Sequence, residues 1–143
     1  MPSKKGGQYM EKKHITAHIE CNNNGFYTVY FDEELPFGCY GEGYSAKEAK
    51  DDFLRVFESM RKKHLERTGE NVDVEFVFVY DASAFLQHYK GLLTLAGLSR
   101  MTGINRAQLS QYVTGRRHPS PKTQEKIKVS VQQFAQELSC AMA

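Results

Sequence analysis

The chain lacks the features that mark membrane, secreted and zinc-binding proteins. Its 143 residues contain no apolar run of the ~18 residues needed to span a bilayer. The polar stretch from Met1 to Lys13 has no apolar middle of the kind found in secretory signals, so we expect a cytoplasmic protein with no membrane partner. The three cysteines are scattered and form no CxxC pair, which predicts neither a disulfide framework nor a metal site.

The C-terminal part is short of acidic residues. Residues 82–143 hold 8 Lys and Arg against 2 Asp and Glu, whereas residues 1–81 hold 11 against 15. The small net charge of +2 therefore hides a basic part that follows an acidic part. This asymmetry predicts two modules with different partners, and the basic module is the candidate for contact with phosphates.

Residues 14–81 have the pattern of a small sheet with one helix, and the polar tail over residues 1–13 is expected to be disordered. Alternating apolar residues with aromatic and β-branched side chains predict four strands. The strands are expected at residues 13–20, 26–31, 39–44 and 72–80. A helix lies between the third and fourth, so the order of this domain is β-β-β-α-β.

Local signals fix the helix of this domain and the character of its strands. Ser45 to Glu48 reads Ser-Ala-Lys-Glu, which fits a capping box, and Gly69 is placed to end the helix. The glycines of the third strand, Gly41 among them, predict a bulge or a close approach to a neighbour. Val77 and Val79 make both faces of the fourth strand apolar, so we expect that strand to be central in the sheet.

Residues 82–143 have the pattern of an all-α helix-turn-helix bundle, which makes the whole chain an α+β protein. Gly103 permits a sharp helix end, and Ile104 supplies the apolar residue of the turn. Asn105 is a good N-cap, and Gln108 is expected to complete a capping box. Gly115 stops the second helix.

A further helix is expected to close this bundle. Pro121 suits its first position. The residues expected on its inward stripe are Ile127, Val131, Phe134 and Leu138.

The second helix of the motif leaves a polar face without carboxylates, which suits the major groove of DNA. Arg106 can bind a guanine edge and Gln111 an adenine edge. The basic loop after Gly115 can hold phosphates beside that helix. The DNA-contacting residues expected from this pattern are Arg106, Ala107, Gln108, Ser110, Gln111, Thr114, Arg116, Arg117 and Lys122.

The stretch LSRMTGINRAQLSQYVTGRRHPSP resembles the helix-turn-helix of phage-repressor-like (Xre/Cro type) proteins. The resemblance implies that Arg106, Ala107 and Gln111 face bases. It also implies that Gln108, Ser110 and Thr114 lie at the groove edge or on phosphate. Leu95 departs from the family, where many members carry a DNA-contacting glutamine.

The N-terminal half is similar to the HicB antitoxin domain. The similarity rests on ITAHIE…GFYTVYFDEELPFGCYGEGYSAKEAKDDF, in which the Leu35–Cys39 corner is one residue longer than the family pattern. It implies a partly degraded RNase H-like sheet that binds a small basic HicA-like toxin that cleaves messenger RNA. The protein would then be a type II antitoxin that neutralises this toxin and represses its own operon as a dimer or higher oligomer.

A basic toxin is expected to meet an acidic surface. The contact candidates are Asp32, Glu33 and Glu34. The last helix and any unpaired sheet edge are both candidates for the contact between copies of the chain.

Two other functions fit the sequence. The chain could be a stand-alone transcriptional regulator that senses a small molecule through its sheet. It could also be a metal-dependent RNase H-like nuclease, for which the candidate ligands are Glu20, Asp32, Glu42 and Asp81. Each of these carboxylates sits at a strand end or turn, where solvated carboxylates are common, so we expect no enzyme, no catalytic residue and no cofactor.

Overall fold

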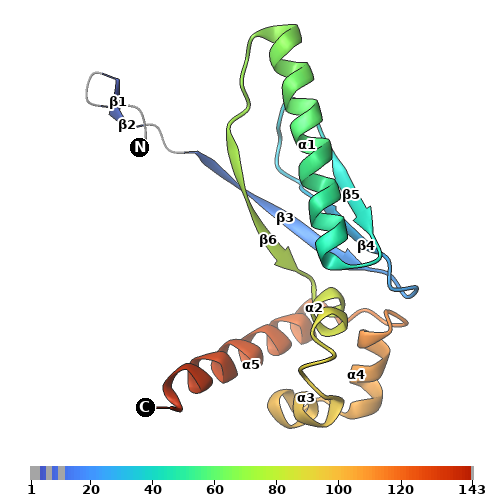
Figure 1. The fold of residues 1–143 in the computed structure, drawn as a ribbon. Coiled ribbons are helices and arrows are strands. Elements are labelled where there is room, and N and C mark those ends of the chain that lie inside the picture. Colours follow the sequence, from blue (N-terminus) through green and yellow to red (C-terminus); the bar gives the residue numbers. More distant parts are fainter. Residues whose placement is uncertain (1–3, 6–7, 10–11, 143) are drawn as a thin grey trace.

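The computed structural model describes residues 4–5, 8–9 and 12–142 of the chain, and Figure 1 shows a sheet domain above a helical domain. At the N-terminus, β1 (Lys4–Lys5) pairs antiparallel with β2 (Gln8–Tyr9). Residues 1–3, 6–7 and 10–11 lie outside the described residues, so the disorder expected for the tail stays a prediction. Within the described ranges, no helix combines the length and apolarity needed to cross a bilayer.

The sheet domain is a meander of three strands extended by one parallel strand. Its strands are β3 (Lys13–Cys21), β4 (Tyr27–Tyr30), β5 (Tyr40–Gly43) and β6 (Val74–Tyr80). They lie in the order β5-β4-β3-β6, with the first three antiparallel and β6 parallel to β3. The observed mixture of sheet and helices agrees with the α+β class expected from the sequence.

The helix α1 (Ala46–Thr68) covers one face of this sheet (Figure 1). Its start is the predicted cap, since Ser45 accepts a hydrogen bond from the backbone N–H of Glu48 at 3.0 Å. Phe53 is fully buried between this helix and the sheet, where its ring meets the edges of Phe76 and Phe78. Burial of side chains of this size is the main favourable term in folding the domain.

The glycines of β5 allow α1 to approach the sheet closely, as the sequence predicts. A Cβ on Gly41 would lie 2.5 Å from the carbonyl oxygen of Ala49 on α1. A Cβ on Gly43 would lie 2.8 Å from the backbone nitrogen of the same residue. No side chain larger than hydrogen therefore fits at either position without moving the helix.

The expectation that the last strand is central is wrong. β6 lies at the edge of the sheet and pairs only with β3, while β3 and β4 occupy the centre. Val77 and Val79 are about half exposed, at 49% and 46%, because α1 covers only the opposite face. On a central strand a second apolar face would indicate burial by another layer. On the edge strand β6 it leaves an exposed apolar surface that is available for contact.

The helical domain consists of four helices around a compact core. They are α2 (Ala82–His88), α3 (Leu95–Thr102), α4 (Arg106–Val113) and α5 (Pro121–Cys140). α4 packs against α2 and α3, and α5 packs mainly against α3. The buried side chains at the centre are Leu86, Leu98, Ile104, Leu109, Tyr112 and Ile127.

α5 closes the bundle as expected, but the expectation that Leu138 faces inward is wrong. Ile127 is its one buried residue, Val131 and Phe134 are half-buried, and Leu138 is 56% exposed. The far half of α5 extends away from the other helices in Figure 1. The apolar stripe therefore continues past the bundle at Leu138, about one turn beyond Phe134.

The two domains are joined without a free linker. The backbone N–H of Asp81 donates to the carbonyl of Ile19 at 2.9 Å, so the β3–β6 pairing continues to the first residue before α2. The chain also meets itself at a second point, because a Cβ on Gly115 would lie 2.9 Å from the backbone of Asn23 in the β3–β4 turn. The loop after α4 therefore rests on the sheet domain.

Candidate DNA-binding surface

The turn between α3 and α4 has the geometry that the sequence predicts. Gly103 takes the left-handed conformation, with φ at 77°, and its N–H donates to the carbonyl of Ser99. Ile104 is buried in the core, which fixes the angle at which the chain enters α4. Asn105 then accepts a hydrogen bond from the N–H of Gln108 at 2.8 Å and begins α4.

The outward side of α4 begins with two exposed residues. Arg106 and Ala107 both point into solvent in the first turn, where no other element covers them. The buried side of the helix is held by Leu109 and Tyr112, which are 0% and 2% exposed. Packing on one side therefore presents the guanidinium of Arg106 on the other, as direct reading of a base edge requires.

The structure gives Gln108 a different task from the one expected. Its side-chain amide donates to the hydroxyl of Tyr112 at 2.7 Å, on the half-buried side of α4. The capping box is therefore only half formed, because the Gln108 side chain is held one turn along the helix and the backbone N–H of Asn105 donates no hydrogen bond to its oxygen. The hydrogen bond to the Tyr112 hydroxyl directs the Gln108 side chain along the helix and away from Asn105.

The far end of α4 combines four of the expected contact residues. The backbone N–H of Arg117 donates to the carbonyl of Gln111 at 3.2 Å, and its guanidinium lies 3.4 Å from the side-chain oxygen of the same glutamine. Thr114 donates its hydroxyl to the carbonyls of Ser110 and Gln111 and so caps the helix. The Gln111 side chain is thus oriented by Arg117 rather than free.

The loop after α4 and the start of α5 supply exposed cations. Arg116, Arg117 and Lys122 are all exposed, while Pro119 between them is buried and anchors the loop. Ser120 caps α5 by accepting from the N–H of Thr123, with Pro121 at the first turn as expected. Cations on an anchored loop of this kind can position a duplex through its phosphates.

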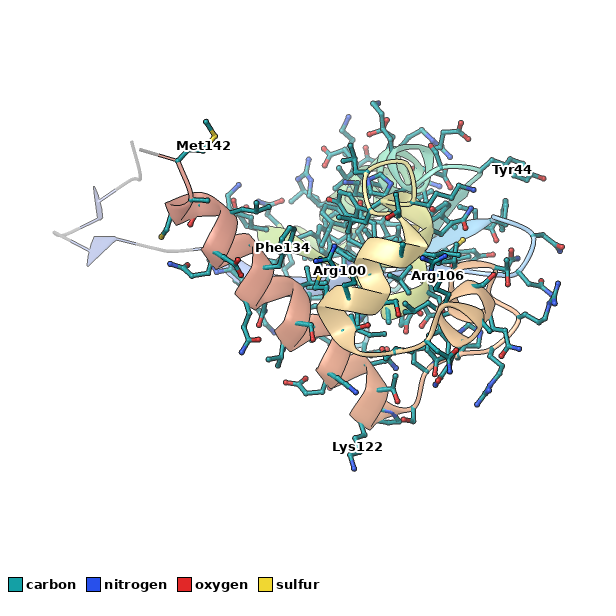
Figure 2. The ribbon with its side chains drawn as sticks, turned by 90° about the horizontal axis from the view of Figure 1, so that it is seen from below. Tyr44, Arg100, Arg106, Lys122, Phe134 and Met142 are labelled. Atoms are coloured by element: carbon teal, nitrogen blue, oxygen red, sulfur yellow. The ribbon has the colours of Figure 1, made fainter. Side chains whose placement is uncertain are left out.

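Two further basic residues were missed by the sequence analysis. Arg100 is exposed in the last turn of α3, and the amine of Lys126 lies over the turn, 3.9 Å from where a Cβ on Gly103 would be. Figure 2 views the helical domain from the end away from the sheet, with Arg100, Arg106 and Lys122 on three different helices. The spacing of Lys122 and Lys126, one helical turn apart, was the available signal for the second.

Asp81, the N-cap of α2, is a carboxylate that interacts with His118 of the loop after α4. Burial raises its pKa, while the hydrogen bond from Ala84 N–H and the nearby ring of His118 act in the opposite direction. Because this side chain is used to begin α2, it does not extend the acidic surface of the sheet domain into the outward side of α4.

The acidic loop after β4 is only partly free. Glu33 accepts the backbone N–H of Thr16 at 3.0 Å, beyond the point where β4 stops pairing with β3. Asp32 lies 3.6 Å from His18 on the sheet face that α1 leaves uncovered, and Glu34 is exposed. The patch expected for the toxin therefore contains two available carboxylates and one with a structural task.

The carboxylates considered for a nuclease do not form a metal centre. Glu20 accepts the hydroxyl of Tyr30 at 2.6 Å, and this bond is the main reason that the pKa of Tyr30 rises to about 12. Asp81 caps α2. Across the part of the chain that the structure describes, no three His, Cys, Asp or Glu side chains are grouped to hold an ion.

Comparison with known proteins found no family model, no curated protein and no solved structure that matches this chain.

Proposed function

We propose that the protein binds operator DNA through α4 and acts as the antitoxin of a type II toxin–antitoxin pair, repressing its own operon. The observation that carries the DNA-binding part is the exposed start of α4, where Arg106 and Ala107 project from a helix held in place by Asn105 and a buried turn. Exposed cations flank this side at Arg100, Arg116 and Lys122. A helix presented this way can enter the major groove while its neighbours hold the backbone.

The antitoxin part rests on the acidic sheet domain and on the resemblance to HicB domains. The sheet domain has the β-β-β-α-β order that its sequence pattern predicts. Asp32 and Glu34 lie on or beside an uncovered sheet face, as expected for contact with a basic toxin. The DNA module does not depend on the toxin, so the two parts of the proposal are tested separately.

DNA binding is tested by fluorescence anisotropy with the fragment upstream of the protein's own gene and a scrambled fragment of equal length. We expect tighter binding to the upstream fragment at low salt, and a loss of about 1–3 kcal/mol for Arg106→Ala. Arg55→Ala is the matched control, since Arg55 is an exposed arginine on α1. Equal affinity for both fragments would contradict the proposal.

Toxin binding is tested with the product of the gene adjacent to this one, which the proposal expects to be a very small basic protein. Glu34→Lys is expected to weaken that complex, because it places a cation against a basic partner. Glu66→Lys on the exposed side of α1 is the control of equal charge change. Unchanged affinity for Glu34→Lys and Asp32→Lys would exclude the acidic loop as the toxin surface, and would leave the DNA-binding part standing.

A further inference from the structure

The far half of α5 carries an apolar stripe that the rest of the described chain covers only in part. Val131 and Phe134 are half-buried, Leu138 is 56% exposed and Met142 is 89% exposed. Figure 2 shows Lys122 and Met142 at opposite ends of this helix, with the Met142 end extending beyond the other helices. A helix that continues its apolar face past its own bundle indicates a contact with another surface.

A groove of about 560 Å³ lies beside the near half of the same helix. It runs between α5, α2 and the end of β6, and its lining is largely apolar. Val79, Phe85, Ile127 and Val131 contribute to it. The groove is open on the β6 side because β6 is an edge strand and Val79 is 46% exposed.

We propose that this groove receives the far half of α5 from a second copy of the chain. The positions of the apolar residues are symmetrical about the point between Gln132 and Gln133. When two α5 helices lie antiparallel about that point, Ile127 of one copy is level with Leu138 of the other, and Val131 is level with Phe134. Each copy then fills the other's groove, which is an isologous two-fold contact.

The charges on α5 agree with a second copy as the occupant. From residue 129 to residue 142 the helix carries one charged side chain, Glu137. In the antiparallel pair, Glu137 flanks Ser130 of the other copy and Lys128 flanks Ala135, so no like charges meet. A surface this neutral offers nothing specific to DNA phosphates or to a basic toxin, whereas it can bury against itself.

Dimerisation through α5 deepens the proposed function, and its role in repression rests on that function. A two-fold operator presents half-sites about 34–36 Å apart, so it needs two recognition helices in a fixed relation. α5 has 20 residues and is about 30 Å long. It carries Lys122 and Lys126 in its first turns, and the proposed contact extends from Ile127 to Leu138, so pairing would set the spacing of the two α4 helices.

The test is the molar mass of the full chain measured by size-exclusion chromatography with light scattering over a dilution series. The unchanged protein is expected to be a dimer. Leu138→Glu is expected to raise the dimer dissociation constant at least about 100-fold, because it places a charge in both grooves. Leu54→Glu is the matched control, since Leu54 is also an exposed leucine on a helix, at 44% exposure. It should leave the dimer unchanged.

Val79→Lys tests whether the dimer contact includes the groove or consists only of two paired α5 helices. It changes an exposed residue of the groove and is expected to weaken the dimer as Leu138→Glu does. A monomeric unchanged protein, a dimer that survives Leu138→Glu, or equal disruption by Leu54→Glu would each overturn the proposal. If Val79→Lys alone left the dimer intact, the groove would be excluded as the contact.

The fold of each variant is checked by circular dichroism, and its affinity for a single half-site separates this inference from the proposed function. Leu138→Glu should retain half-site binding and lose the preference for a two-fold operator. If the unchanged protein is a dimer that Leu138→Glu dissociates, but it binds no DNA, the proposed function is contradicted while the inference about the α5 contact stands.

Discussion

The two domains are stabilised in different ways: local caps begin the helices of the helical domain, whereas packing between distant residues holds the sheet domain together. In the helical domain every helix begins with a side-chain cap, and these caps are Asp81, Thr94, Asn105 and Ser120. In the sheet domain the decisive contacts join residues far apart in the sequence, such as Phe53 with Phe76. Short capped helices can present an exposed face such as that of α4, while the sheet domain depends on close packing between layers.

The largest expected effect is a loss of stability in the sheet domain, from a substitution at the close contact between β5 and α1. Gly41→Ala would place a methyl group 2.5 Å from the carbonyl oxygen of Ala49, and we expect a loss of about 3 kcal/mol or more in the free energy of unfolding. Urea denaturation followed by circular dichroism measures it. Gly38→Ala is the control, because a Cβ there meets nothing within 4 Å. Equal stability of the two variants would show that α1 does not need the close approach.

The next prediction distinguishes residues of the helical domain that contact bases from residues that contact phosphates. Arg106→Ala is expected to lose about 1–3 kcal/mol of affinity for the preferred site and little for unrelated DNA. Arg116→Ala should weaken binding to all DNA sequences alike. It should also lower the slope of the logarithm of the binding constant against the logarithm of the salt concentration by about one. Arg116 is a better probe than Arg117, whose guanidinium lies beside Gln111. Anisotropy titrations at several salt concentrations measure both, and identical behaviour of the two variants would contradict the assignment.

The junction between the domains is tested by comparing two glycines that share a backbone conformation. Gly115 and Gly25 have φ at 73° and 75°, so an alanine at either costs about 1 kcal/mol in strain. At Gly115 the new methyl also lies 2.9 Å from the backbone of Asn23, whereas at Gly25 it meets open space. Gly115→Ala is therefore expected to lower the melting temperature more than Gly25→Ala. Equal shifts would mean that the loop does not rest on the sheet domain.

The smallest effect concerns Asp81, where the two domains meet. Asp81→Ala is expected to lose about 1 kcal/mol, because it removes the cap of α2, whereas Asp81→Asn keeps the cap and removes the charge. Burial raises the pKa of this carboxyl in the folded protein, so its stabilising contribution is present below the pKa of the unfolded chain, about 4, and declines as the pH rises through the folded value.

The stability of the unchanged protein relative to Asp81→Asn should therefore fall from pH 4 towards neutrality. Thermal unfolding of both proteins across this range measures the difference. A difference that stays constant with pH would mean that burial does not perturb this carboxyl.

Sequence signals acting over a few residues predicted local structure well. The caps at Ser45 and Asn105, the helix ends at Gly69 and Gly103, and the start of α5 at Pro121 are all present. Each depends on a side chain and a backbone group within about one helical turn, so the sequence contains the whole interaction.

Predictions that depend on distant partners were weaker. Val77 and Val79 have the same pattern whether β6 is central or at the edge, because only the position of its neighbours differs. The stripe on α5 indicates an apolar face, but the small size of the bundle leaves Leu138 uncovered. In each case the sequence pattern did not show which element, if any, packs against the apolar face.

The most direct test of α4 as the recognition helix is a panel of single-base changes across the bound operator, measured with the unchanged protein and with Arg106→Ala. The account predicts that one guanine change costs the unchanged protein about 1–3 kcal/mol and costs Arg106→Ala nothing. If the variant discriminates every position as the unchanged protein does, Arg106 reads no base, and α4 is not presented to DNA as described.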